Sequence, residues 1–345
     1  MGALSAFRVG VGRVNRSPLI VVGMFLVTLF VALPLSVALR GMLAAHLGQS
    51  LAADAAASGV NYEWWQEFST SASGLGTTFA PTIVGFAAVL DNLSSLFDNL
   101  PLAATIVGAT IAWMTIWSFL SGGVLDRYAR NRPTRAVGFF AACGTHFWRF
   151  LRLAIVGWLV YVFLFSVLHS WIFDAAYGRL TQDLTVERQA FAIRLAGYFL
   201  FGAALVLCAM VFDFARVRIV VEDRRSAISA LAASIRFVRR NFSSVARLYL
   251  LNGILFALLL ALYAIVGRGA ARSGWQMWMV LAGGELYILG RHYLKLWFYA
   301  SEIAFFQSAL AHAEYTAGPT VVWPDSPAVE AVINAEPARR PHEVT

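Results

Sequence analysis

The sequence contains little charge and almost no lysine. Asp, Glu, Lys and Arg make up 13% of the 345 residues, and Lys295 is the only lysine among 27 basic side chains. A soluble domain carries about 25% charged residues. Here 59% of the residues are hydrophobic and the mean hydropathy is +0.67, which is too much apolar surface for an aqueous core. The composition therefore predicts that lipid surrounds much of the protein.

Cysteine is also scarce, and the common catalytic motifs are missing. Cys143 and Cys208 form no CxxC pair, and the 6 histidines form no HExxH or HxH pair. There is no GxxxxGK[ST] phosphate loop and no GxSxG nucleophile motif. These patterns normally carry metal, phosphate or acyl-transfer chemistry. We therefore expect no metal, no cofactor and no enzymatic activity.

Long apolar runs separated by basic loops predict an all-α, polytopic membrane protein. A run of about 20 residues spans the hydrocarbon core. Residues 1–312 are expected to form a single six-helix transmembrane domain with two or three interfacial amphipathic helices. The predicted spans are about 18–39, 101–125, 153–173, 191–214, 248–266 and 275–297. Residues 313–345 hold five of the 10 prolines, which predicts a mostly irregular tail.

The first run has an alternative interpretation as a signal peptide, because Arg8, Arg13 and Arg16 precede it. The apolar part of a signal peptide is usually about 7–15 residues long. The run from Pro18 to Leu39 is longer than that. We therefore interpret it as the first transmembrane helix.

Three segments have the spacing of amphipathic helices. In residues 81–97, Ile83, Phe86, Leu90 and Phe97 recur at helical intervals, which indicates an interfacial or a re-entrant helix. Residues 137–152 and residues 226–240 carry basic side chains among apolar ones, as helices at a membrane surface do.

The distribution of basic residues predicts an orientation. With six spans, 21 of the 27 Lys and Arg residues fall on the side that holds both termini. Loops rich in Lys and Arg face the cytoplasm. The sequence therefore predicts cytoplasmic termini and an outward-facing segment 41–100. The near-complete use of arginine is typical of a GC-rich bacterial genome, so we expect a multi-pass protein of the bacterial inner membrane.

The last predicted span carries ionisable side chains on one face. Glu285, His292 and Tyr299 are spaced seven residues apart, and so are Lys295 and Glu302. We call these five residues the polar stripe. An ionisable group deep in a membrane helix is a functional candidate by default. One interpretation is a path for protons or ions, or a site for a polar headgroup. The other is a buried network that holds helices together.

The most charged part of the chain lies between the fourth and fifth spans. This basic segment contains Arg216, Arg218, Glu222, Asp223, Arg224, Arg225, Arg236, Arg239 and Arg240. Its net positive charge predicts contact with anionic lipid headgroups at the cytoplasmic face, or with a partner membrane protein. A net charge of +8 is also found in nucleic-acid-binding proteins. Because the charge here lies in short loops beside apolar runs, we expect no nucleic acid. A simple solvated connection is the competing interpretation.

Residues 216–231 read RVRIVVEDRRSAISAL and continue through RFVRR at 236–240 into an apolar run. An acidic pair thus leads into an alanine-containing helix, then an aromatic and basic turn, then a span. This order resembles a broad group of six-helix bacterial inner-membrane proteins, which includes the membrane region attached to some glycerophosphodiester phosphodiesterases. The glycine pair Gly122–Gly123 fits the same pattern. The resemblance implies the fold, and it implies no activity because the chain has no phosphodiesterase catalytic domain.

These patterns favour a non-enzymatic membrane protein, an accessory or scaffolding component that packs against other membrane proteins or lipids. The spans are rich in Phe, Trp and Leu, which suits packing more than conduction. The alternative is a transporter or lipid-handling protein that uses the polar stripe.

Overall fold

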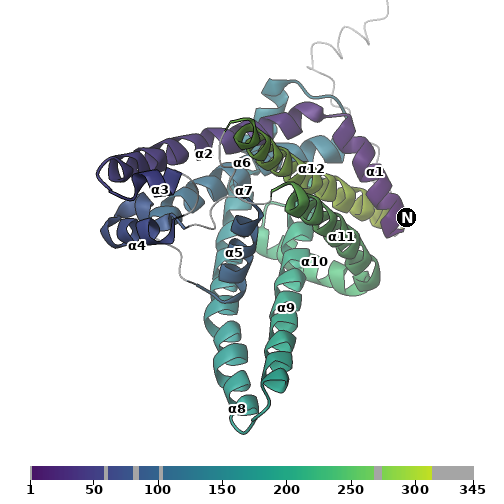
Figure 1. The fold of residues 1–345 in the computed structure, drawn as a ribbon. Helices are drawn as coiled ribbons and strands as arrows, with labels where there is room; N and C mark the ends of the chain where they lie inside the picture. The colour runs from purple at the N-terminus through teal and green to yellow at the C-terminus, as the bar shows by residue number, and fades with distance from the viewer. Residues whose placement is uncertain (1, 58–60, 81–84, 101–103, 268–273, 313–345) are drawn as a thin grey trace, which may run out of the picture. The chain divides into compact units, whose positions relative to one another are not determined.

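A computed structural model of the chain describes residues 2–57, 61–80, 85–100, 104–267 and 274–312 (Figure 1). The chain divides into two units, residues 1–307 and residues 308–345, and the contacts below all lie in the first. Throughout the described residues the regular structure is helical, with no strand. The predicted all-α class is confirmed for this part of the chain. The predicted irregular tail, residues 313–345, lies outside the described residues.

Five helical segments are long and apolar enough to cross a membrane. The shortest has 25 residues, about 37 Å at 1.5 Å per residue, which exceeds a hydrocarbon core of ~30 Å. This is the arrangement of a multi-pass integral membrane protein. The five are α2 (Pro18–Leu47), α6 (Ala104–Arg130), the run that begins with α7 (Ala136–Phe163), α9 (Glu187–Val221) and α11 (Phe242–Val266).

The sixth predicted span, residues 275–297, lies within α12 (Trp275–His312). This helix is not among the five apolar ones. Glu285, Arg291 and Lys295 interrupt its apolar sequence, and each charged side chain lowers the hydropathy of the helix. The six-span arrangement therefore stays a prediction.

A separate interfacial helix at residues 137–152 is corrected by the structure. Helix α7 begins at Ala136 and runs through this segment without a break. The chain stays helical to Thr181, through two π-helical segments and a last short helix. These are η3 (Leu164–His169), η4 (Trp171–Ala176) and α8 (Tyr177–Thr181). No proline or glycine pair interrupts residues 137–152, so nothing in the sequence separates a surface helix from the span that follows.

The connection between α2 and α6 contains several short helices that fold back on the end of α2. Trp64 donates its indole N–H to His46 Nδ1 of α2 at 3.2 Å, and Phe68 packs on the same imidazole with ring centroids 5.3 Å apart. The helices are α3 (Ala53–Ala57), α4 (Tyr62–Ser71), the 3-10 helix η1 (Gly74–Thr78) and α5 (Phe86–Phe97). Helix α5 covers most of the predicted amphipathic segment 81–97, of which residues 81–84 lie outside the described residues.

Glycine allows α6 and α7 to approach closely. A Cβ atom added at Gly123 would lie 2.5 Å from Cys143 Sγ and 2.9 Å from the Phe139 carbonyl oxygen. Real side chains do not fit at such distances, so this position requires glycine. Because the two helices are this close, the basic turn that joins them lies beside the start of α7.

The sequence does not predict the N-terminal helix α1 (Ala3–Asn15). Helix α1 packs on α12, where the Trp297 indole N–H donates to the Phe7 carbonyl at 2.8 Å. Gly10 permits this contact, because a Cβ atom there would lie 2.1 Å from Ser301 Oγ. The buried face of α1 consists of Ala3, Ala6, Gly10 and Val14, a helical spacing of small residues that sequence reasoning overlooked.

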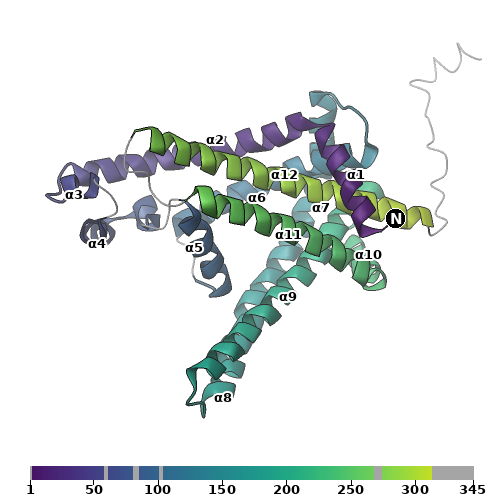
Figure 2. The ribbon, with the colours of Figure 1, turned by 45° about the vertical axis from the view of Figure 1, so that its right-hand side comes forward.

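Helices α11 and α12 lie side by side and run antiparallel (Figures 1 and 2). Tyr263 stacks on Tyr287 with ring centroids 4.3 Å apart, and at the other end Tyr249 meets Phe298 edge to face at 4.6 Å. Helix α10 (Ala227–Arg240) connects α9 to α11. Together α9, α11 and α12 position the candidate site.

Candidate functional site

Six polar side chains from three helices meet where α9, α11 and α12 come together. Asp213 and Arg216 lie one turn apart on α9, and Tyr249 projects from the first turns of α11. Helix α12 supplies the other three. This polar cluster consists of Asp213, Arg216, Tyr249, Lys295, Tyr299 and Glu302. Asp213, Tyr299 and Glu302 are all buried.

Hydrogen bonds join the three helices through this cluster. Arg216 Nη1 donates to Asp213 Oδ1 at 2.9 Å and to the Tyr299 hydroxyl at 3.3 Å. The Tyr249 hydroxyl lies 2.9 Å from Asp213 Oδ2 and 3.0 Å from Glu302 Oε1. A phenol has one proton, so Tyr249 donates to one carboxylate at a time and tethers α11 to either neighbour.

The cluster contains two acidic and two basic side chains. Arg216 pairs with Asp213 at 2.9 Å, and the Lys295 Nζ lies 4.9 Å from the centre of the Tyr299 ring. Buried charges are tolerated when they are paired and hydrogen-bonded, and breaking one pair typically costs about 3–5 kcal/mol. Glu302 Oε2 is the one atom of this cluster that is buried without a hydrogen-bond partner among the described residues.

The predicted polar stripe of α12 does not act as a single face. Lys295, Tyr299 and Glu302 enter the polar cluster, but His292 Nε2 lies 2.8 Å from the Thr28 hydroxyl of α2. Glu285 is half-buried and makes no hydrogen bond with a described residue. Ten residues separate Glu285 from Lys295, about 15 Å along a helix. Within the described residues the stripe therefore contacts different neighbours at different levels.

Asp213 and Tyr249 were missed as site residues by the sequence reasoning. The signal for Asp213 was present, because it follows the apolar stretch AMVF and is itself an ionisable residue in a predicted span. Tyr249 lies between two leucines and is indistinguishable by sequence from any interfacial tyrosine. The Tyr249 hydroxyl reaches Asp213 and Glu302 only because α11 packs against α9 and α12.

A cavity of about 350 Å³ lies beside the polar cluster, between α6, α11 and α12. Lys295 belongs to both the cavity and the cluster, and Trp117 links them through a ring contact of 6.2 Å with Tyr299. The lining residues are Trp113, Trp117, Asn252, Phe256, Arg291, His292, Leu294 and Lys295. Cationic groups against aromatic walls suit an anionic or amphipathic ligand.

The basic segment is divided between internal contacts and an exposed surface. Arg216 lies in the polar cluster. Arg218 pairs with Glu222 at 3.1 Å and lies over the ring of Phe306 at 5.0 Å. Arg224 also pairs with Glu222. Glu222 therefore holds two arginines at the end of α9, and Arg218 connects α9 to Phe237 of α10 and Phe306 of α12.

Asp223 and the remaining arginines lie on the outside. Asp223 accepts a hydrogen bond from Arg149 of α7. The side chains of Arg225, Arg236, Arg239 and Arg240 are exposed. On α10, Arg236, Arg239 and Arg240 share the surface with two exposed isoleucines, Ile228 and Ile235. Ala230, Phe237 and Val238 face inward. An exposed mixture of arginine and isoleucine suits a membrane surface with anionic headgroups.

The site offers charge and hydrogen bonding, with no arrangement typical of a metal centre. Among the described residues, no three His, Cys, Asp or Glu side chains gather as metal ligands would. Comparison with family models, curated proteins and solved structures finds no match. The resemblance to six-helix inner-membrane proteins therefore stays a prediction, and function has to be argued from the geometry.

Replacing Tyr249 with phenylalanine is expected to destabilise the protein. Among the described residues no other hydroxyl contacts both Asp213 and Glu302, so the change leaves a buried carboxylate oxygen without its donor. The expected loss is about 1–3 kcal/mol, measured by unfolding in detergent. Tyr263→Phe makes the same chemical change on the same helix, where the hydroxyl bonds to no described residue, and serves as the control. Equal effects of the two variants would contradict the role of Tyr249.

The Arg149–Asp223 pair is expected to make stability sensitive to acid. The hydrogen bond from Arg149 lowers the pKa of the Asp223 carboxyl, so its contribution is present above the unfolded value of about 3.9 and is lost as pH falls through the lowered pKa. Asp223 has φ of 49°, which asparagine tolerates. Asp223→Asn should cost about 0.5 kcal/mol at pH 7.

The melting temperatures of wild type and Asp223→Asn should converge as the pH falls below the lowered pKa of Asp223. Asp183→Asn, an exposed loop position, should melt like wild type throughout. A difference between wild type and Asp223→Asn that persists unchanged into acid would show that the pair does not act through its charge.

Proposed function

We propose that the protein is a non-enzymatic integral component of the bacterial inner membrane, an accessory or scaffolding protein that packs against other membrane proteins or lipids. The observation that carries the proposal is the use of the polar side chains of α12. Tyr299 hydrogen-bonds to α9, Glu302 to α11 and His292 to α2. These three side chains hold helices to one another, as the structural interpretation of the polar stripe requires.

The outward faces of the long helices support the same proposal. Along α11 the exposed side chains are almost all apolar, and they recur every three or four residues. They include Leu250, Ile254, Leu258, Leu262 and Ile265. Between them lie the exposed small residues Gly253, Ala257 and Ala261, a spacing at which membrane helices approach one another. Such a surface suits lateral packing within a membrane.

The orientation belongs to this proposal. The 21-to-6 distribution of basic residues supports cytoplasmic termini if α12 completes a sixth span. The exposed arginines of α10 would then face the anionic lipid of the cytoplasmic leaflet.

A transporter or lipid-handling protein is the second candidate. The cavity beside the polar cluster favours it, because Lys295 and His292 lie there against Trp113 and Trp117. A cavity of about 350 Å³ is within the range of small-ligand sites.

In-cell photo-crosslinking separates the two candidates. A photoreactive residue is placed at outward positions on three helices, Phe30, Phe199 and Ala257, with buried Ala300 as the control. The accessory function predicts a discrete protein adduct from at least one outward position and none from Ala300. A photoreactive residue at Asn252, which lines the cavity, is expected to capture lipid under the second candidate.

The same experiment can also refute the accessory function. No protein adduct from any outward position, together with a monomer that elutes alone in mild detergent, would refute it. A lipid adduct confined to Asn252 would then favour the lipid-handling alternative.

A further inference from the structure

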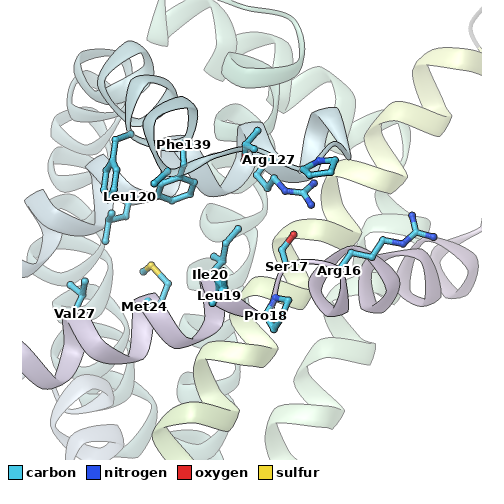
Figure 3. Close-up of a pocket in the computed structure, with 15 residues that line it drawn as sticks. Arg16, Ser17, Pro18, Leu19, Ile20, Met24, Val27, Leu120, Arg127 and Phe139 are labelled. Carbon is cyan, nitrogen blue, oxygen red and sulfur yellow. The ribbon is translucent and has the colours of Figure 1, made fainter.

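A second cavity, of about 470 Å³, lies where α1 meets α2, opposite the turn between α6 and α7. Figure 3 shows side chains of α2 along one side and those of α6 and α7 along the other. Most of its wall is apolar and includes Ile20, Met24, Val27, Leu120 and Phe139. At one end it is polar, and this end holds Arg16, Ser17 and Arg127 (Figure 3).

Arg127 is a buried cation without a counter-charge. The residue is only 8% exposed, and its guanidinium forms no hydrogen bond or ion pair with a described residue. Its neighbour Asp126 pairs instead with Arg130, at 2.9 Å. The guanidinium faces the cavity, so a ligand there can supply the acceptor that the described residues do not.

Ser17 is a second unsatisfied group at the same end. It is also 8% exposed, and its Oγ has no hydrogen-bond partner in the described structure. Ser17 precedes the first residue of α2 but does not cap it through its side chain. Pro18 has no N–H and the Ile20 N–H bonds to the Ser17 carbonyl, so the helix start contributes mainly the partial positive charge of its dipole, which attracts anions.

The two groups and the apolar wall define one kind of ligand. Arg127, the exposed Arg16 and the start of α2 require an anion with several acceptor oxygens, and a guanidinium binds phosphate through two parallel hydrogen bonds. The wall requires an apolar chain several carbons long. Free phosphate matches only the polar end, and a neutral lipid matches only the wall.

We propose that this cavity binds an anionic phospholipid, with the headgroup phosphate on Arg127 and Ser17 and one acyl chain along Ile20, Met24 and Leu120. The phosphate accepts hydrogen bonds from the Arg127 guanidinium and from the Ser17 hydroxyl. Both groups then have the hydrogen-bond partner that no described residue provides. The site lies on helices other than those of the polar cluster, so its failure would leave the proposed function untouched.

The test uses the full-length protein in detergent, titrated with lipids and followed by native mass spectrometry and thermal shift. The probes are phosphatidylglycerol, phosphatidylcholine with the same acyl chains, and glycerol phosphate as the free headgroup. Wild type is expected to bind phosphatidylglycerol about tenfold more tightly than phosphatidylcholine, because only the former carries net negative charge to pair with Arg127. Glycerol phosphate should bind more weakly than either lipid.

Arg127→Gln should bring phosphatidylglycerol binding down to the level of phosphatidylcholine. Arg135→Gln is the matched control, since Arg135 is exposed, lies in the turn that follows α6 and does not line the cavity. If Arg127→Gln does not fold, Arg127→Lys replaces it, and the single ammonium should keep part of the preference.

A second pair of variants tests the acyl-chain part of the cavity without changing any charge. Gly23 lines the cavity, and a Cβ atom there has nothing within 4 Å, so the side chain of Gly23→Leu is expected to occupy the cavity. Gly41 on the same helix is equally open and does not line the cavity, so Gly41→Leu is its control. Gly23→Leu should abolish the specific binding of phosphatidylglycerol, and Gly41→Leu should not change it.

Three results would overturn the proposal. The first is no preference for phosphatidylglycerol in wild type, and the second is equal binding by Arg127→Gln and Arg135→Gln. The third is glycerol phosphate binding as tightly as phosphatidylglycerol, which would identify the source as free phosphate and remove the acyl chain from the site.

Discussion

The charged side chains of the polar cluster have to be paired or hydrogen-bonded, because helices α9 and α12 bury them away from water. Asp213 and Arg216 come from α9, and Glu302 and Lys295 from α12. Arg216 and Asp213 pair within α9, whereas the buried Glu302 of α12 takes its hydrogen bond from Tyr249 of another helix. Tyr249 of α11 completes the contact by reaching a carboxylate on each side. The relative positions of the three helices follow from this requirement more directly than from apolar packing, which lipid tails satisfy equally well.

The rest of the structure is arranged around α12. Its far end receives α1 through the close contact of Gly10 with Ser301, and Arg13 of α1 donates to Gln307 at 2.9 Å. Phe306 supports Arg218 of α9. Because α12 makes so many contacts with other helices of the chain, its polar side chains serve the fold. The outward faces of the protein are then left for contact with lipid or with other membrane proteins. The unpaired Arg127, in contrast, lies outside this network, and its position beside an apolar cavity is what distinguishes a ligand site from a structural one.

The sequence allowed most of the helical framework to be predicted, because apolar runs of span length have few alternatives. It located Lys295, Tyr299 and Glu302 by their spacing on one helix. It did not separate them from Glu285 and His292, because one periodicity describes all five and only neighbouring helices decide which ones meet. Asp213 was visible as a charge in an apolar run, whereas Tyr249 acquires its role from tertiary contact alone. The cavity of Arg127 and Ser17 was beyond prediction, since it depends on how the start of α2 faces a turn more than 100 residues away.

The most direct test of the account is a double-mutant cycle between Tyr249→Phe and Glu302→Gln, with the free energy of unfolding measured in detergent for the wild type, both single variants and the double variant. If the polar cluster ties α11 to α12, the two changes remove one shared interaction, and the double variant should be more stable than the sum of the single effects predicts, by about 0.5–3 kcal/mol. Effects that add to within about 0.3–0.5 kcal/mol would show that the two residues act independently. They would contradict the claim that this cluster holds the helices together.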